Sequence, residues 1–173
     1  LNIRYNESFV TSQDYELWAR LMHHTRFANL PEVLVDVRRH QKQITTLKED
    51  DLRKNTAKIR KSQLKKLGIE PTKIEEQMHY YCVRAGFEAT NSNFKHLSQW
   101  LLKLQNRNQS QQVYPEPAFT NLLKRIWHRH TAGHTHLGFS FFKIIQQNPL
   151  STYHEWSTFQ KMKFKAKCLL RRK

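Results

Sequence analysis

The sequence predicts a mostly helical protein with one small α/β piece near its start. Glycine is scarce, with four residues in 173, so the chain has few of the breaks that separate short strands. Apolar residues recur at helical spacing along most of the chain. One run, VLVDVRRH, alternates instead, with Val33, Val35 and Val37 on one side. Alternating β-branched residues are typical of a short strand, which accounts for the α/β piece.

The first expected helix spans about residues 11–23. Thr11 is followed three residues later by Asp14, which is the acidic variant of a capping box. The apolar residues that follow fall on one helical face, namely Leu17, Trp18, Leu21 and Met22. Pro31 then precedes the alternating run, as is common at the entrance to a strand or on an edge strand.

Helical spacing resumes at Asp50 and continues nearly to the end. Gly68 is expected to end the first of these helices, and Pro71 to open the next. The charged connector at residues 48–51 leads us to expect two parts, residues 1–47 and residues 48–173. The apolar stripes of the expected helices are Leu52, Ile59, Leu64 and Leu67; Ile74, Met78, Tyr81, Cys82 and Ala85; Phe94, Leu97, Trp100, Leu101 and Leu104; Phe119, Leu122, Leu123, Ile126 and Trp127; and Phe159, Met162, Ala166, Leu169 and Leu170.

The composition favours an anionic partner and a reducing compartment. Lys and Arg number 30 against 14 Asp and Glu, a formal charge of +16. Two distant cysteines make no disulfide framework, so we expect a cytoplasmic protein. No apolar run approaches the roughly 18 to 20 residues that span a bilayer. The chain begins with Leu1 rather than Met, in the middle of a pattern, and we expect it to be a piece of a longer protein.

Two stretches carry a family resemblance. SQDYELWARL followed by FANLPEVLVDVRRHQKQIT resembles the end of the catalytic domain of family 2 glycosyltransferases, most specifically over residues 8–46. QLKKLGIEPT, WLLKLQNRN and YPEPAF resemble the helical tail of bacterial members. The resemblance implies that residues 1–47 are the C-terminal end of a nucleotide-sugar-binding α/β domain of the GT-A type. Residues 48–173 would then be a helical extension.

The resemblance also implies a reaction. Such enzymes transfer a sugar from a nucleotide-sugar donor to an acceptor, here a glycan or lipid-linked glycan of cell-envelope polysaccharide synthesis. Asp14 holds the position of the general base, which takes the proton of the acceptor hydroxyl. Gln13 stands where the family usually has Glu, and it would bind the acceptor together with Trp18. Spacing alone favours a simple helix cap for Asp14, and it is the family resemblance that favours the role of base.

The expected strand ends in Arg38 and His40, which the resemblance places near the departing diphosphate. His40 would also approach a divalent metal, Mn or Mg, in the intact enzyme, although both residues could be ordinary polar residues at a strand end. The family's acidic metal-binding motif, Asp-x-Asp, does not occur in the sequence. We therefore expect this chain alone to lack the donor site, to hold no cofactor and to be inactive.

Two further features give an alternative. The histidines of HRHTAGHTH have no nearby Cys to complete a zinc spacing, so we expect no metal there. The basic residues of 52–67 and the tail KMKFKAKCLLRRK, which mixes Lys with apolar side chains, are typical of a helix lying on anionic lipid. The alternative function is a non-catalytic basic helical module that binds nucleic acid or an anionic membrane, such as the inner face of the plasma membrane. No known DNA- or RNA-binding motif is present, and no specific nucleic acid is expected.

Overall fold

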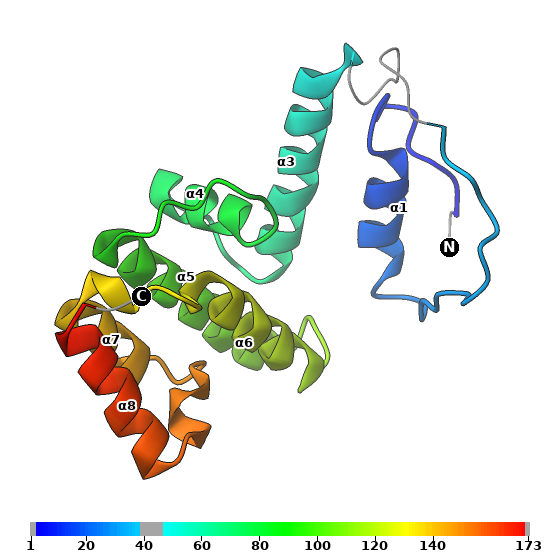
Figure 1. Ribbon diagram of the computed structural model, residues 1–173. Helices are drawn as coiled ribbons and strands as arrows, with labels where there is room; N and C mark the ends of the chain where they lie inside the picture. The colour runs from blue at the N-terminus through cyan, green and yellow to red at the C-terminus, as the bar shows by residue number, and fades with distance from the viewer. Residues whose placement is uncertain (1–2, 39–46, 172–173) are drawn as a thin grey trace. The chain divides into compact units, whose positions relative to one another are not determined.

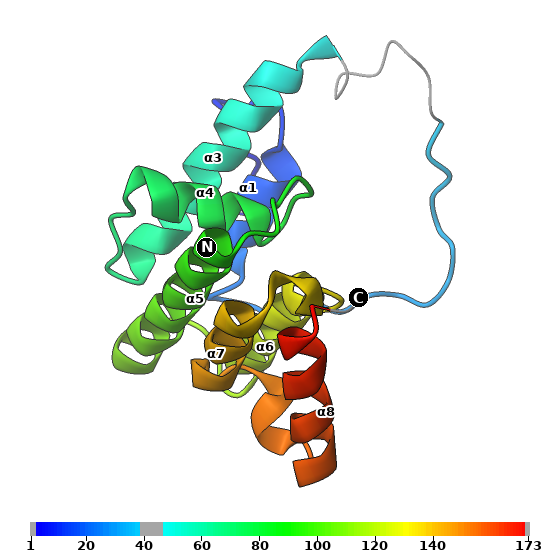
Figure 2. The same cartoon turned by 60° about the vertical axis from the view of Figure 1, so that its left-hand side comes forward.

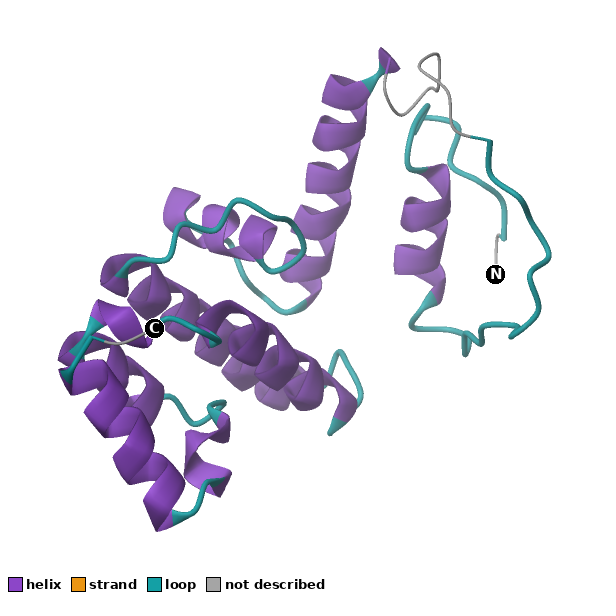
Figure 3. Ribbon diagram, in the orientation of Figure 1, coloured by secondary structure: helices purple, strands orange, loops and turns teal. Residues whose placement is uncertain are grey.

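The computed structural model describes residues 3–38 and 47–171, and the chain divides into two compact units (Figure 1). The N-terminal unit comprises Leu1–Lys66 and the C-terminal unit Leu67–Lys173. Within the described residues every regular element is an α-helix or a short 3-10 helix (Figure 3). The assignment of residues 1–47 to a catalytic domain and of residues 48–173 to an extension stays a prediction.

The expected α/β piece is wrong. Residues 33–38 form no strand, and no sheet occurs in the described ranges, so the chain is not part of a GT-A α/β domain as folded here. Val33 and Val35, expected on one face of a strand, are 87% and 76% exposed. The physical reason is that alternation marks a strand only when a neighbouring strand completes the hydrogen-bond ladder. The described part of the chain contains no such neighbour.

The N-terminal unit is built from two packed helices. α1 (Gln13–Leu21) lies against α3 (Glu49–Lys66), and its buried residues are Ala19 and Leu21. α3 has the sparse apolar stripe that the sequence predicts, with Ile59 and Leu64 buried. Its many basic side chains project away from this stripe, as is usual for the solvated face of an amphipathic helix.

The C-terminal unit surrounds a long central helix, α5 (Asn91–Gln111). Helices α4 (Lys73–Tyr81), α6 (Ala118–Thr131) and α7 (Phe139–Gln147) each pack against α5 (Figure 2). Two 3-10 helices, Thr135–Leu137 and Thr152–Glu155, lead into and out of α7, and α8 (Thr158–Leu169) packs on α7. The five apolar residues predicted for α5 are all buried, as Phe94, Leu97, Trp100, Leu101 and Leu104.

Aromatic packing and two buried asparagines hold this unit together. Phe94 is fully buried and its ring meets those of Trp127 and Phe141 at centroid distances of 6.4 and 4.9 Å. Asn108 donates to the carbonyl of Tyr114 and accepts from its N–H, at 3.0 and 2.8 Å. Asn148 donates to Ser98 Oγ at 2.8 Å. Buried amides with satisfied hydrogen bonds fix the loops that they join.

Cys82 and Cys168 are free, as the cysteine count predicts, and both are buried. Burial raises the pKa of the Cys82 thiol to about 12 and that of Cys168 to about 11. Neither thiol is therefore a reactive nucleophile. In the described ranges, the helices all fall short of the length and apolarity needed to cross a membrane.

Candidate functional site

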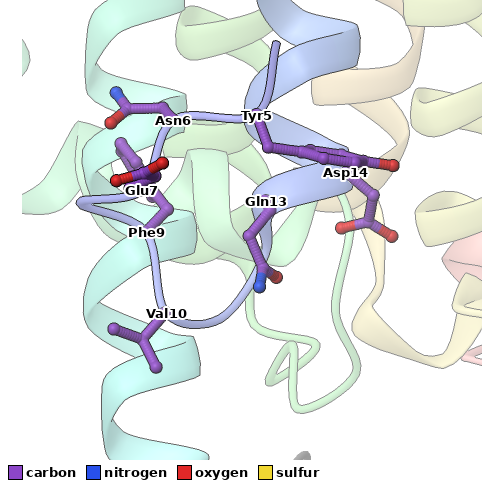
Figure 4. A pocket seen from close by; sticks show the side chains of 7 residues that line it. All are labelled: Tyr5, Asn6, Glu7, Phe9, Val10, Gln13 and Asp14. Atoms are coloured by element: carbon purple, nitrogen blue, oxygen red, sulfur yellow. The ribbon is translucent and has the colours of Figure 1, made fainter.

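The candidate base Asp14 lies in the first turn of α1, at the edge of an open hollow of about 560 Å³ (Figure 4). The side chains that line the hollow all come from the start of the chain and of α1. They are Tyr5, Asn6, Glu7, Phe9, Val10, Gln13 and Asp14. Both predicted residues of the QD pair thus face one concavity, and both are exposed to solvent. A small polar ligand could reach them without any movement of the chain.

The segment before α1 forms one wall of the hollow, and hydrogen bonds hold it against the helix. Arg20 pairs with Glu16 at 3.1 Å and also donates through Nη2 to the carbonyl of Arg4 at 2.7 Å. Asn6 tightens the segment by accepting from the N–H and the hydroxyl of Ser8, at 3.0 and 2.8 Å. Such a turn, made by an Asn side chain, competes with helix and keeps the segment irregular.

The residue just before the N-cap of α1 is hydrogen-bonded to α3. Asn55 donates through Nδ2 to both the carbonyl and the hydroxyl oxygen of Thr11, at 3.1 and 3.0 Å, and both residues are buried. The predicted capping box is therefore wrong, because the Thr11 hydroxyl bonds to Asn55 instead of the helix. Ser12 is the N-cap residue, at φ 64°, and its side chain makes no capping bond. The left-handed Ser12 turns the chain so that α1 starts beside the hollow.

The carboxylate of Asp14 has two roles open to it. Its Oδ1 accepts from the N–H of Tyr15 at 2.7 Å, which satisfies one of the unpaired donors of the first turn. The side chain is nevertheless exposed, so its other oxygen can accept from a ligand in the hollow. Placement at a helix N-terminus stabilises a negative charge there. Capping and acceptor contact are thus compatible at this one residue.

Sequence reasoning missed three polar residues of the hollow, Tyr5, Asn6 and Glu7. Glu7 brings a second carboxylate to the same concavity, although Gln13 replaces the acid adjacent to Asp14. These three residues belong to the segment RYNESF, in which polar and aromatic residues precede the helix without periodic spacing. That composition was the only indication of a binding site. The sequence of this segment does not indicate its path relative to α1. In the structure, the hydrogen bond from Arg20 to the carbonyl of Arg4 holds the segment alongside the helix.

Trp18 lies one helical turn beyond Asp14 but lines a different concavity. It is 54% exposed and contributes to an apolar groove together with Tyr15, Ala19, Met22, Phe27, Ala28, Asn29 and Gln63. Burial raises the pKa of Tyr15, against an opposing effect of the nearby Arg60 charge. The predicted acceptor residues Gln13 and Trp18 are therefore divided between two neighbouring surfaces of α1.

Of the two predicted donor-side residues, only Arg38 is described, and it does not line the hollow. Arg38 is exposed in the irregular segment that follows Val37, and His40 lies outside the described residues. No group of three or more His, Cys, Asp or Glu side chains within residues 3–38 and 47–171 could hold a metal.

Of the histidines in HRHTAGHTH, His130 and His134 pack against the aromatic core, whereas His128 is exposed. His130 Nε2 lies 3.1 Å from the carbonyl of Tyr81, to which its protonated form donates, and its ring lies 4.8 Å from that of Phe87. His134 packs on Phe94 at 5.4 Å. Burial lowers the pKa of both imidazoles, helped by the Arg129 charge at His130 and by His136 at His134.

Comparison of the chain with protein-family models, with curated proteins and with solved structures found no match.

Proposed function

We propose that this chain supplies the acceptor side of a family 2 glycosyltransferase, with Asp14 as the general base. The observation that carries the proposal is the position of Asp14 in the first turn of α1, on the same hollow as Gln13 and Glu7. The order of SQDYELW, NLPEVL and RRH supports it independently. The proposal concerns this site and does not require a sheet in the chain.

In the proposed step, the acceptor hydroxyl gives its proton to the carboxylate of Asp14 as its oxygen attacks the anomeric carbon of the donor sugar. A new C–O bond forms, and the bond from that carbon to the nucleoside diphosphate breaks. Hydrogen bonds from the amide of Gln13 and from Asn6 would orient the acceptor in the hollow. Glycan hydroxyls suit such a rim because each can donate and accept.

The donor would be bound elsewhere. The sequence has no Asp-x-Asp motif, and the described residues offer no metal group. We therefore propose that the nucleotide-sugar and any divalent ion are held by another part of the enzyme. The acceptor, a glycan or a lipid-linked glycan, is the ligand that this chain would recognise.

The binding test uses the chain itself. Heteronuclear NMR titration with short oligosaccharides should shift the backbone signals of residues 5–7, 13 and 14, with Kd values in the millimolar range or tighter. Titration with nucleoside diphosphate and Mn²⁺ should leave them in place. Specific binding of the nucleotide, or no response to any glycan, would contradict the assignment of an acceptor site.

The catalytic test uses the enzyme with its donor-binding part. Asp14→Asn should lower kcat by about 10²- to 10⁴-fold with little change in donor binding. Asp36→Asn is the matched control, because Asp36 is an exposed acid of the same unit outside the hollow, and it should retain full activity. Glu7→Gln tests whether the second carboxylate is the base instead. Loss of kcat in Glu7→Gln alone would overturn the role of Asp14.

A further inference from the structure

Helix α8 presents apolar side chains to solvent. Phe159, Met162, Leu169 and Leu170 are 75, 66, 58 and 62% exposed, although the sequence spacing groups them as one apolar stripe. At 100° per residue they fall within one sector of the helix, together with the exposed Ala166. A contiguous apolar stripe on a small surface helix needs an explanation other than chance exposure.

This stripe is not the core face of α8, since the opposite face already packs inward. Phe164 lies 5.2 Å from the Trp156 ring and 6.1 Å from that of Phe142. Cys168, one turn further along, is completely buried. The helix therefore has two apolar faces. One is used by the C-terminal unit, and the described residues leave the other uncovered.

Lysines border the exposed stripe on both sides. Lys163 and Lys167 follow it on one flank, where both are exposed. On the other flank the ammonium groups of Lys161 and Lys165 lie 5.6 Å over the Tyr153 ring and 6.0 Å over the Phe142 ring. The helix contains no acidic residue. The charge of this surface is thus uniformly positive around an apolar centre.

We propose that the outward face of α8 is a docking site for an anionic lipid bilayer. In this geometry the helix lies in the plane of the interface, its apolar stripe enters the acyl boundary, and the flanking lysines meet anionic headgroups. This inference does not rest on the proposed glycosyltransferase function, because it concerns residues of the C-terminal unit only.

The size and charge of the stripe favour lipid over a macromolecular partner. Four side chains of this kind expose on the order of 500 Å², less than the about 800 Å² that each side of a stable protein interface contributes. A phosphate backbone would pair with the lysines but leave the apolar side chains in water. A bilayer can bury the apolar side chains and pair its anionic headgroups with the lysines. Each lysine near an anionic surface strengthens binding roughly fivefold.

Helix α3 provides a comparison within the same chain. It carries at least as many basic residues, among them Lys54, Lys58 and Lys61, but its large apolar residues Ile59 and Leu64 are buried. Purely electrostatic attraction is expected there, and it fades with salt. The presence of the apolar stripe is what singles out α8 as a site that binds lipid by insertion.

The experiment is co-sedimentation of the full chain with vesicles of phosphatidylcholine containing 30% phosphatidylglycerol, compared with pure phosphatidylcholine. The parent should bind the anionic vesicles and keep part of that binding at 0.5 M NaCl. Phe159→Ser with Leu169→Ser should lose at least tenfold in partitioning and all of the salt-resistant binding. Leu122→Ser is the matched control, because Leu122 is a 43% exposed apolar residue on α6, and it should bind like the parent.

Further variants and ligands test the contribution of charge and distinguish lipid from nucleic acid and from a protein partner. Lys163→Gln with Lys167→Gln should weaken vesicle binding about 25-fold at low salt, from roughly fivefold per lysine. The double Ser variant should bind duplex DNA as well as the parent does. Failure of the parent to bind anionic vesicles at low salt would overturn the proposal, as would unchanged binding of the Ser variant. Concentration-dependent self-association lost in the Ser variant, without vesicle binding, would assign the stripe to a protein partner instead.

Discussion

The two units of the molecule bury their apolar residues very differently. In the C-terminal unit, α5 is enclosed by α4, α6 and α7, and its Trp100 is 1% exposed. In the N-terminal unit, α1 and α3 bury only small patches, while Trp18 and Phe27 remain 54% and 56% exposed. A packed aromatic core stabilises one unit, whereas the other combines a small aliphatic contact between two helices with a few polar hydrogen bonds. The candidate catalytic residue lies in the less packed unit and the candidate lipid surface in the better packed one.

The largest effect should come from the core of the C-terminal unit. Phe94→Ala removes a fully buried ring that packs on Trp127 and Phe141, and it should cost about 3–5 kcal/mol in the free energy of unfolding. Urea denaturation followed by tryptophan fluorescence measures this. A loss below about 1 kcal/mol would mean that this core is not the stabilising centre of the unit.

A smaller loss is expected when the buried amide of Asn108 is removed. Asn108→Ala removes the hydrogen bonds that this buried amide makes with the N–H of Tyr114 and with Oε1 of Glu116, which should cost about 2 kcal/mol. Asn106→Ala, an exposed position on the same helix, is the control and should change stability by less than about 0.5 kcal/mol. Equal effects of the two variants would show that the loop does not depend on this network.

In the N-terminal unit, the corresponding tie joins Asn55 to Thr11. Asn55→Ala should destabilise this unit by about 1–2 kcal/mol, because it leaves the buried oxygens of Thr11 unpaired. It should also weaken glycan binding at the hollow, although Asn55 does not line it. Hydrogen exchange of the α1 amides reports the first effect. Thr56→Ala, at the next residue of α3, should change neither the hydrogen exchange of the α1 amides nor glycan binding. Loss of glycan binding in this variant would indicate general destabilisation of α3.

The C-terminal unit should also be weaker in mild acid. The pKa of His130 and that of His134 are lowered in the folded state, so the unfolded chain binds more protons as the pH falls. Stability is therefore full above the ordinary imidazole pKa of about 6.5 and declines as the pH drops through that value toward the lowered ones. Thermal melts between pH 7.5 and 5 measure the decline, and His130→Gln should reduce it. A melting temperature that rises toward pH 5 would contradict the sign.

The smallest effect is expected at the alternating run of the N-terminal unit. Val33→Ser with Val35→Ser should change the free energy of unfolding by less than about 0.5 kcal/mol, since both side chains are already in water. Chemical denaturation of this variant beside Phe94→Ala sharpens the contrast between the units. A loss above about 2 kcal/mol would show that these valines are buried in a sheet after all.

The helices with regular apolar spacing could be predicted from the sequence, because the apolar residues that set the spacing are the same residues that become buried. α5 shows all five of its predicted core residues buried. α7 was missed, although its FSFFKII segment supplies Phe141 and Phe142 to the core, because a short and mostly apolar run has no clear period. The strand was predicted from alternation, but alternation carries no information about a partner strand.

The amino-acid sequence alone is enough to predict the helical composition, the strong positive charge, the free cysteines and the position of Asp14 at the start of a helix. Tertiary structure decided which apolar stripe of α8 became core, since Phe164 and Cys168 found partners on α7 and its neighbours while Phe159 and Leu170 did not. It also decided that Thr11 bonds to Asn55 and that Tyr5 and Glu7 join Asp14 in one hollow. Local pattern shows which residues can share a face, but burial depends on what the rest of the chain brings against that face.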